Sequence, residues 1–228
     1  MKRNLSAVLM VVFIITALGC ATTSNQVKIM PIKDHPDTYN RINEIGKKVI
    51  LVIDPENLNN YRVAVADDDG VNAFTTMPQT DDTGKNIYLI VFLSGTLSIF
   101  DDEELTFIMA HEVAHCKLNH VQKKAGLSLG ISAIFTVVGV FVPGAGLLDY
   151  AVNPLATSAY SRSQETDADI LAVDALKKLG MSSDPAIRSF KILDNIAVQK
   201  GIKDSERIGI LDDHPSLQAR IQKIRNLQ

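Results

Sequence analysis

Two histidines stand four residues apart in the segment His111-Glu112-Val113-Ala114-His115. Residues at this spacing on an α-helix point the same way within about 40°, so both imidazoles can reach one ion. Neutral imidazole nitrogen suits Zn²⁺, and two such ligands leave a tetrahedral site half filled. Glu112 is turned by about 100° from His111, where it can reach a water bound to the metal. The segment therefore divides into two metal ligands and one base.

A catalytic zinc site needs a third protein ligand and keeps its fourth position for water. Glu165 and Asp169 are again four residues apart and share one face of a helix expected over 158–179. We assign Glu165 as the third ligand, with Asp169 accepting a hydrogen bond from the ring nitrogen of His111 that faces away from the metal. The alternative is an exposed acidic helix face that also includes Asp167.

Chance does not explain the first segment, because a chain of this composition would contain it roughly 0.003 times. The alternative that needs no metal is a pair of helix histidines satisfied by hydrogen bonds, with Glu112 as a solvated charge. Two nearby residues look ordinary. His120 lies off the face of His111 and His115 and is expected to be solvated, and Cys116 is expected to be a buried, inert thiol.

The elements that must position these residues follow from hydrophobic periodicity and turn signals. The acidic run 101–104 predicts an N-cap and capping box for a helix over 102–123, which carries the two histidines. Gly180 closes the helix that carries Glu165. Further helices are expected at 36–51, 184–200 and 215–226, and strands at 61–66, 71–77 and 86–93.

The N-terminus has the layout of a bacterial lipoprotein. Lys2 and Arg3 precede an uncharged, largely apolar run that ends in small residues before Cys20. We expect a signal peptide over 1–19, lipidation of Cys20, a tether over 20–30 and one folded domain, which carries the zinc site, over 31–228. The alternative is an uncleaved membrane anchor, and both place the domain outside the cytoplasmic membrane. The formal net charge of -3 offers no basic surface, so nucleic acid is not an expected partner.

Residues 125–148 contain no charged side chain and are long enough to span a membrane. A single crossing would put His111 and Glu165 on opposite sides of the bilayer, so the metal assignment excludes it. A re-entrant hairpin and a buried or surface-lying apolar helix remain open. We favour a helical flap packed beside the cleft.

Three segments together resemble a known family: His111 to His115, Ser161-Arg162 with Glu165 and Ala168-Asp169, and His214-Pro215 with Arg220. They are similar to the zinc endopeptidases that include the HtpX-like proteases and the CAAX prenyl proteases, above all their compact periplasmic lipoproteins. The resemblance implies a mainly helical α+β fold, a gluzincin-type metallopeptidase core. In it a small three-stranded sheet accompanies an HExxH helix packed against the third-ligand helix, with one Zn²⁺ per chain.

The resemblance also implies roles for two further residues. His214 would lie near the metal, either stabilising the developing oxyanion or binding the zinc in a closed resting state. The alternative is structural, with His214 capping the last helix and Pro215 starting it. Arg162 is expected to brace the site by pairing with an acid.

These inferences predict a zinc-dependent endopeptidase of the bacterial cell envelope, lipid-anchored in the periplasm at the outer membrane. Glu112 is the general base, and the substrates are unfolded or misassembled proteins that pair with an edge strand, either 71–77 or 86–93. The outer-membrane assembly machinery is a candidate partner. One alternative is a non-catalytic lipoprotein stapled by zinc that binds assembly intermediates. A second alternative is hydrolysis of a non-peptide amide or ester.

Overall fold

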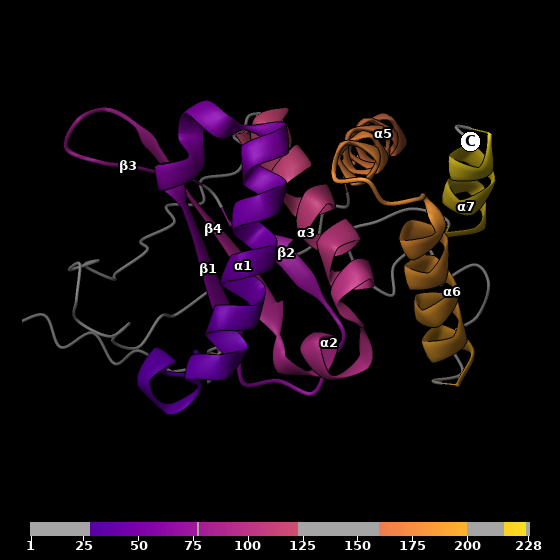
Figure 1. Ribbon diagram of the computed structural model, residues 1–228, viewed down its shortest axis with the longest axis horizontal. Helices are drawn as coiled ribbons and strands as arrows, with labels where there is room; N and C mark the ends of the chain where they lie inside the picture. The colour runs from indigo at the N-terminus through magenta and orange to yellow at the C-terminus, as the bar shows by residue number, and fades with distance from the viewer. Residues whose placement is uncertain (1–27, 77, 123–159, 200–216, 227–228) are drawn as a thin grey trace, which may run out of the picture.

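The computed structural model describes residues 28–76, 78–122, 160–199 and 217–226 (Figure 1). Four predicted features lie outside the described residues: the signal peptide, the lipidated Cys20, the uncharged segment 125–148 and His214. Among the helices of the described part, none is long and apolar enough to cross a membrane.

A small mixed sheet forms one side of the molecule. Its strands are β1 (Tyr61–Ala66), β2 (Ala73–Thr75), β3 (Gln79–Thr80) and β4 (Asn86–Leu93). The strand β4 is central, running parallel to β1 and antiparallel to β2 and β3. The sheet therefore has four strands where three were expected. The missed strand β3 has only two residues, too few to show a period-2 pattern.

Helix α1 (Pro36–Ile53) and helix α3 (Asp102–Lys117) pack together and against the sheet. The stripe Ile42, Ile45, Val49 and Ile50 of α1 is buried, as its periodicity predicts. Short elements join these parts: η1 (Ile32–Asp34), η2 (Pro55–Asn60) and α2 (Ser94–Ile99). Because the sheet and α1 flank α3 and two further helices cover its other sides, twelve of the sixteen residues of α3 are buried.

The predicted start of α3 is confirmed. The backbone N–H of Glu104 donates to Asp101 Oδ1 at 2.8 Å, and the Asp101 N–H donates to Glu104 Oε2 at 3.0 Å, which completes a capping box. The predicted end at 123 is wrong, because the helix stops at Lys117. Asn119 adopts a left-handed backbone with φ of 54°, which turns the chain out of the helix.

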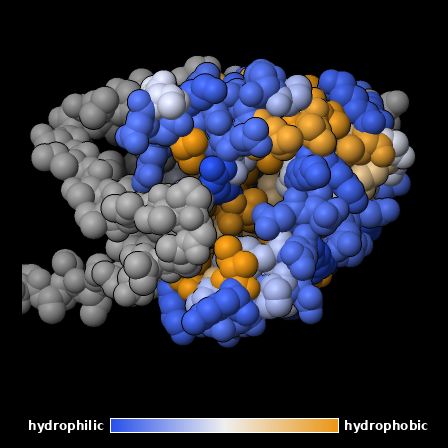
Figure 2. Space-filling model, turned by 60° about the vertical axis from the view of Figure 1, so that its left-hand side comes forward, coloured by the Kyte–Doolittle hydropathy of each residue, from blue (hydrophilic) through white to orange (hydrophobic). Residues whose placement is uncertain are grey.

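Three helices complete the fold: α5 (Arg162–Lys178), α6 (Asp184–Gln199) and α7 (Leu217–Arg225). Helix α5 makes the most extensive helix contact of α3, and its buried residues include the small side chains of Ala168, Ala172 and Ala175. Helices α6 and α7 lie side by side at the end of the molecule away from the sheet (Figure 1). The face in Figure 2 is largely hydrophilic, with apolar residues in a central hollow and in a patch towards the upper right. The expected packing of the HExxH helix on the third-ligand helix is confirmed.

The close approach of Gly95 to the loop before β2 can be tested by mutation. A Cβ at this position would lie 2.3 Å from the carbonyl oxygen of Asp69 and 2.4 Å from that of Gly70, so the loop before β2 would have to move. We expect Gly95→Ala to lower the free energy of unfolding by about 1–3 kcal/mol in urea denaturation. The control Ser98→Ala, on an exposed residue of the same helix, should change it by less than about 0.5 kcal/mol. Equal midpoints for the two variants would contradict the close approach.

Candidate metal centre

The structure brings His111, His115 and Glu165 together in the protein interior. Their ligand atoms lie within 4.8 Å of one another, and all three side chains are buried. The two Nε2 atoms are 3.0 Å apart. From Glu165, Oε1 lies 3.3 Å from His115 Nε2 and Oε2 lies 3.5 Å from His111 Nε2. One carboxylate thus faces both imidazoles.

These separations can be compared with those of a bound zinc ion. Tetrahedral bonds of 2.0–2.2 Å place neighbouring ligand atoms about 3.3–3.6 Å apart. The three observed separations, from 3.0 to 3.5 Å, come close to the edges of that tetrahedron. Two neutral imidazoles and one carboxylate are also a donor set that catalytic zinc uses. The residues therefore fit the ion that the sequence predicts.

The electrostatics of the site also favour a cation. Burial alone would lower the pKa of His111, but hydrogen bonds to Asp169 and Glu165 outweigh it and raise the pKa to about 9. A buried site that binds a proton this strongly has a negative electrostatic potential. A metal ion there competes with that proton, so its binding should weaken as the pH falls.

Asp169 holds the ring of His111 in place. Its Oδ1 lies 3.1 Å from His111 Nδ1, the contact assigned to it from sequence. Burial would raise the pKa of Asp169, but the charge and hydrogen bonds of Arg220, together with His111, lower it below its usual value. The ionised carboxylate accepts the Nδ1 proton of His111, which leaves the Nε2 lone pair directed at the metal position.

Arg220 from α7 is the arginine that braces the site. Its guanidinium donates two hydrogen bonds of 2.7 Å to Asp169, and its Nη1 lies 3.2 Å from Glu165 Oε2. It also stacks over the ring of Phe190 at 4.3 Å. Arg162, expected in this role, is exposed at the first residue of α5, and no acid of the described residues pairs with it. Arg220 lies more than fifty residues beyond the acids it binds, so sequence spacing gave no sign of the contact.

The ligand His115 is held in place by two residues to which the sequence analysis gave no role at the site. His120 Nδ1 lies 3.0 Å from His115 Nδ1, and the Tyr160 ring stacks on His115 with centroids 3.9 Å apart. His120 is only 2% exposed, so the expectation that it is solvated is wrong. The turn at Asn119 returns the side chain to α3, and helical periodicity no longer applies to it. When a metal binds His115 Nε2, the Nδ1–H of His115 donates to His120 Nδ1. The proton of the His120 ring is then on its Nε2.

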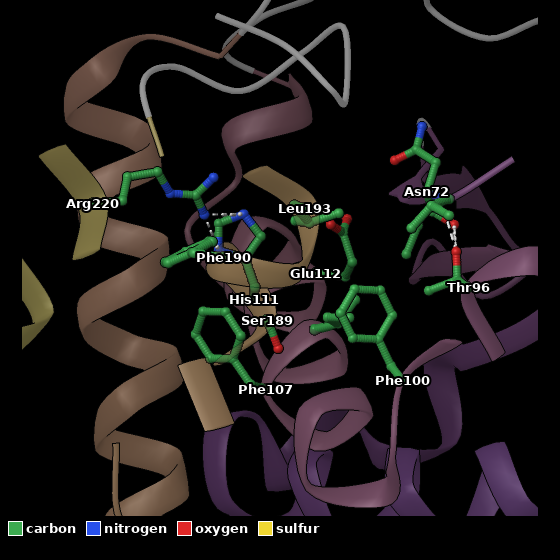
Figure 3. Close-up of a pocket in the computed structure, with 13 residues that line it drawn as sticks. Asn72, Thr96, Phe100, Phe107, His111, Glu112, Ser189, Phe190, Leu193 and Arg220 are labelled. Carbon is green, nitrogen blue, oxygen red and sulfur yellow. Dashed lines mark hydrogen bonds between the residues drawn. The ribbon is translucent and has the colours of Figure 1, made fainter. Parts of the chain in front are cut away.

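Glu112 is rotated around α3 from the two histidine ligands, as helical geometry predicts. Its side chain is buried, and its Oε2 accepts a hydrogen bond of 3.0 Å from Thr75 of β2. Figure 3 shows Glu112 and His111 at the edge of one cavity. Cys116 also contacts Thr75, and burial raises the pKa of its thiol, which confirms the expected buried and inert group. The base assigned from sequence thus lines the same cavity as the ligand His111.

Comparison with known proteins agrees with these features. The chain is 28% identical to the metalloprotease LoiP of Escherichia coli (strain K12) over 172 residues, which cover 73% of this chain and 62% of LoiP. It is 29% identical to the metalloprotease YcaL of the same organism over 139 residues, which cover 58% of this chain and 52% of YcaL. A protease HtpX homolog of Limosilactobacillus fermentum is 28% identical over 210 residues, covering 73% of this chain and 67% of the homolog.

The matched part of the chain therefore spans between half and two thirds of the length of the two E. coli relatives. The crystal structure of S. mikatae Ste24p aligns with 87% of this chain and 51% of its own, with a TM-score of 0.45 and 17% identity. Residues 36–228 match Peptidase family M48, and this range includes all the residues that build the metal centre. The chain belongs to peptidase family M48.

Proposed function

We propose that this protein is a zinc-dependent endopeptidase of the bacterial cell envelope that cleaves unfolded or misassembled proteins. The observation that carries the proposal is the convergence of His111, His115 and Glu165 on one point, next to the buried carboxylate of Glu112. The family match and the names of the relatives, which are metalloproteases, support the reaction class. The donor set supports one Zn²⁺ per chain.

When bound, zinc would supply a water with a pKa of about 7 and would polarise the carbonyl of the peptide bond. Glu112 accepts the proton of the attacking water and passes it to the leaving amine. Thr75 fixes the orientation of Glu112 through its 3.0 Å hydrogen bond to Oε2. Asp169 and His120 hold the rings of the two ligands, so the basic nitrogens keep facing the reaction centre.

The strand β2 is the edge along which a substrate would bind. Among the described residues it pairs only with β4, and its Thr75 touches the general base. The other edge considered from sequence, 86–93, is wrong, because β4 is central and has partners on both sides. A chain added beside β2 would be recognised by its backbone. Folded proteins rarely offer such a segment, which supports a preference for unfolded chains.

The envelope location rests on the N-terminal sequence. The run before Cys20 supports export and lipidation, and Ala21 after the cysteine supports the outer membrane by analogy with lipoproteins of this type. A protease tethered there would meet proteins during their assembly, which makes the outer-membrane assembly machinery the proposed partner. His214 stays a candidate for oxyanion stabilisation or for a zinc contact in the resting state.

Replacing the base separates catalysis from metal binding. We expect Glu112→Gln to keep one zinc per chain and to lose about 100-fold or more in kcat/KM on a denatured protein, because the amide cannot take the proton. Glu103→Gln, on an exposed residue of the same helix, is the control and should keep wild-type activity. Full activity of Glu112→Gln would remove the base assignment. A zinc-loaded wild type that binds denatured chains and leaves them intact would support the non-catalytic alternative.

Removing the third ligand tests the metal centre. Glu165→Ala should lose most of the bound zinc, as measured by metal analysis after gel filtration, since only two ligands remain. The control Asp167→Ala, exposed on the same helix, should bind zinc as the wild type does. In the wild type, a chelator should lower the unfolding temperature and abolish cleavage, and added zinc should restore both. Unchanged zinc content in Glu165→Ala would mean that the third ligand lies elsewhere.

The contact between His120 and His115 predicts an effect on metal affinity. His120→Ala should weaken zinc binding by about 10- to 100-fold, because His115 loses the acceptor that orients its ring. His120→Asn places an amide oxygen near the position of Nδ1 and should restore part of the affinity. The readouts are the zinc dissociation constant and the rate of zinc release to a chelator. Equal values in the wild type and in His120→Ala would rule out this role.

A further inference from the structure

The ring of Tyr160 lies flat against the imidazole of His115. The two ring centroids are 3.9 Å apart, and the ring planes meet at only 15°. Tyr160 is 8% exposed and His115 is 0% exposed, so the contact is made in the protein interior. A tyrosine ring therefore covers one face of a residue that the donor set assigns to the metal.

The other contacts of His115 are made at the edge of its ring. Its Nδ1 lies 3.0 Å from His120 Nδ1, and its Nε2 lies 3.3 Å from Glu165 Oε1. These contacts fix the directions of the two nitrogens, but hydrogen-bond geometry still tolerates some tilt of the ring about the axis that joins them. A ring stacked on the face resists this tilt, because tilting would push the imidazole into it. Tyr160 therefore restrains a motion that the polar contacts leave open.

Tyr160 also connects the two helices that carry the metal ligands. It immediately precedes Ser161, the N-cap of α5, whose side chain accepts a hydrogen bond from the Gln164 N–H. The side-chain amide of Gln164 donates to the His120 carbonyl at 3.4 Å, just beyond the end of α3. Glu165 follows in the first turn of α5. The start of α5 is thus fixed to the end of α3 where the third ligand enters the site.

We propose that Tyr160 is a positioning residue of the metal centre, which holds the imidazole of His115 ready for the ion and slows the loss of the ion. A ring that is already in place gives up little freedom when the ion binds. The face of a tyrosine ring also attracts positive charge. An imidazole that binds a cation becomes more positive, so the stack is stronger with the ion than without it. The proposal rests on the zinc site of the proposed function and concerns the retention of its ion.

The test compares variants that keep or remove the flat ring. Tyr160→Leu and Tyr160→Met keep a large apolar side chain without an aromatic face. In both, the zinc dissociation constant and the rate of zinc release to a chelator should rise by about 10-fold. Tyr160→Phe keeps the ring and should retain zinc as the wild type does. Equal constants and rates in the wild type and the two non-aromatic variants would overturn the proposal.

Tyr88→Leu is the matched control for the loss of a buried, stacked ring. Tyr88 is also 8% exposed, and its ring stacks on that of Tyr61 with centroids 5.0 Å apart and 25° between the planes, within the sheet. Both leucine variants should lower the unfolding temperature of the zinc-free protein, because each removes buried contacts. Added zinc should raise the unfolding temperature of Tyr88→Leu as much as that of the wild type, and that of Tyr160→Leu by less. Equal increases in the two variants would mean that Tyr160 supports only the fold.

Cobalt(II) bound in place of zinc gives a readout of ligand positions. Its visible absorption depends on the arrangement of the ligand atoms. The spectrum of Tyr160→Leu should differ from that of the wild type in band position or intensity, whereas Tyr160→Phe and Tyr88→Leu should keep the wild-type spectrum. An unchanged spectrum in Tyr160→Leu would contradict the positioning of His115 by the stacked ring.

These measurements need no cleavage, so the two proposals can fail separately. If the wild type binds zinc and leaves denatured proteins intact, the peptidase function fails, and the zinc constants still decide the role of Tyr160. If the wild type cleaves them and Tyr160→Leu retains zinc equally well, the peptidase function stands and the positioning role of Tyr160 fails.

Discussion

The structure depends on balancing the charges buried between α3, α5 and α7. Three carboxylates, those of Glu112, Glu165 and Asp169, lie in the interior beside one guanidinium, that of Arg220. With the histidines neutral and the three carboxylates ionised, these four groups carry a formal charge of -2. Buried charges are tolerated only when they are paired. A divalent cation held by His111, His115 and Glu165 would bring this formal charge to zero, so it would also stabilise the interior.

The same constraint explains why the ligands come from such rigid elements. A capping box sets the start of α3 and another sets that of α5, where Ser161 accepts from the Gln164 N–H. Small residues of α5 bring the helices close, so the carboxylate reaches both imidazoles. The rings of His111 and His115 are held by different kinds of partner. An ionised carboxylate pinned by Arg220 holds His111, whereas a neutral histidine and a stacked tyrosine hold His115.

The parts that could be predicted from sequence are those set by local spacing. The two histidines, the base, the later Glu165 and Asp169, and the bounds of β1 and β4 all follow from helical or strand periodicity. What escaped prediction arises where that periodicity ends. Asn119 leaves the helix with a positive φ and so returns His120 to the site. Arg220 and Tyr160 join through tertiary packing, for which one sequence has no local signal.

The proposed function, together with the position of β2, suggests how one site could process many sequences and still favour unfolded proteins. An edge strand such as β2 recognises only an extended backbone, which a folded protein seldom presents. Folding also pairs most backbone N–H and C=O groups within the protein. Under the proposed peptidase function, a segment that can bind beside β2 is therefore one that has failed to fold or assemble, and its exposed backbone would be the signal for cleavage.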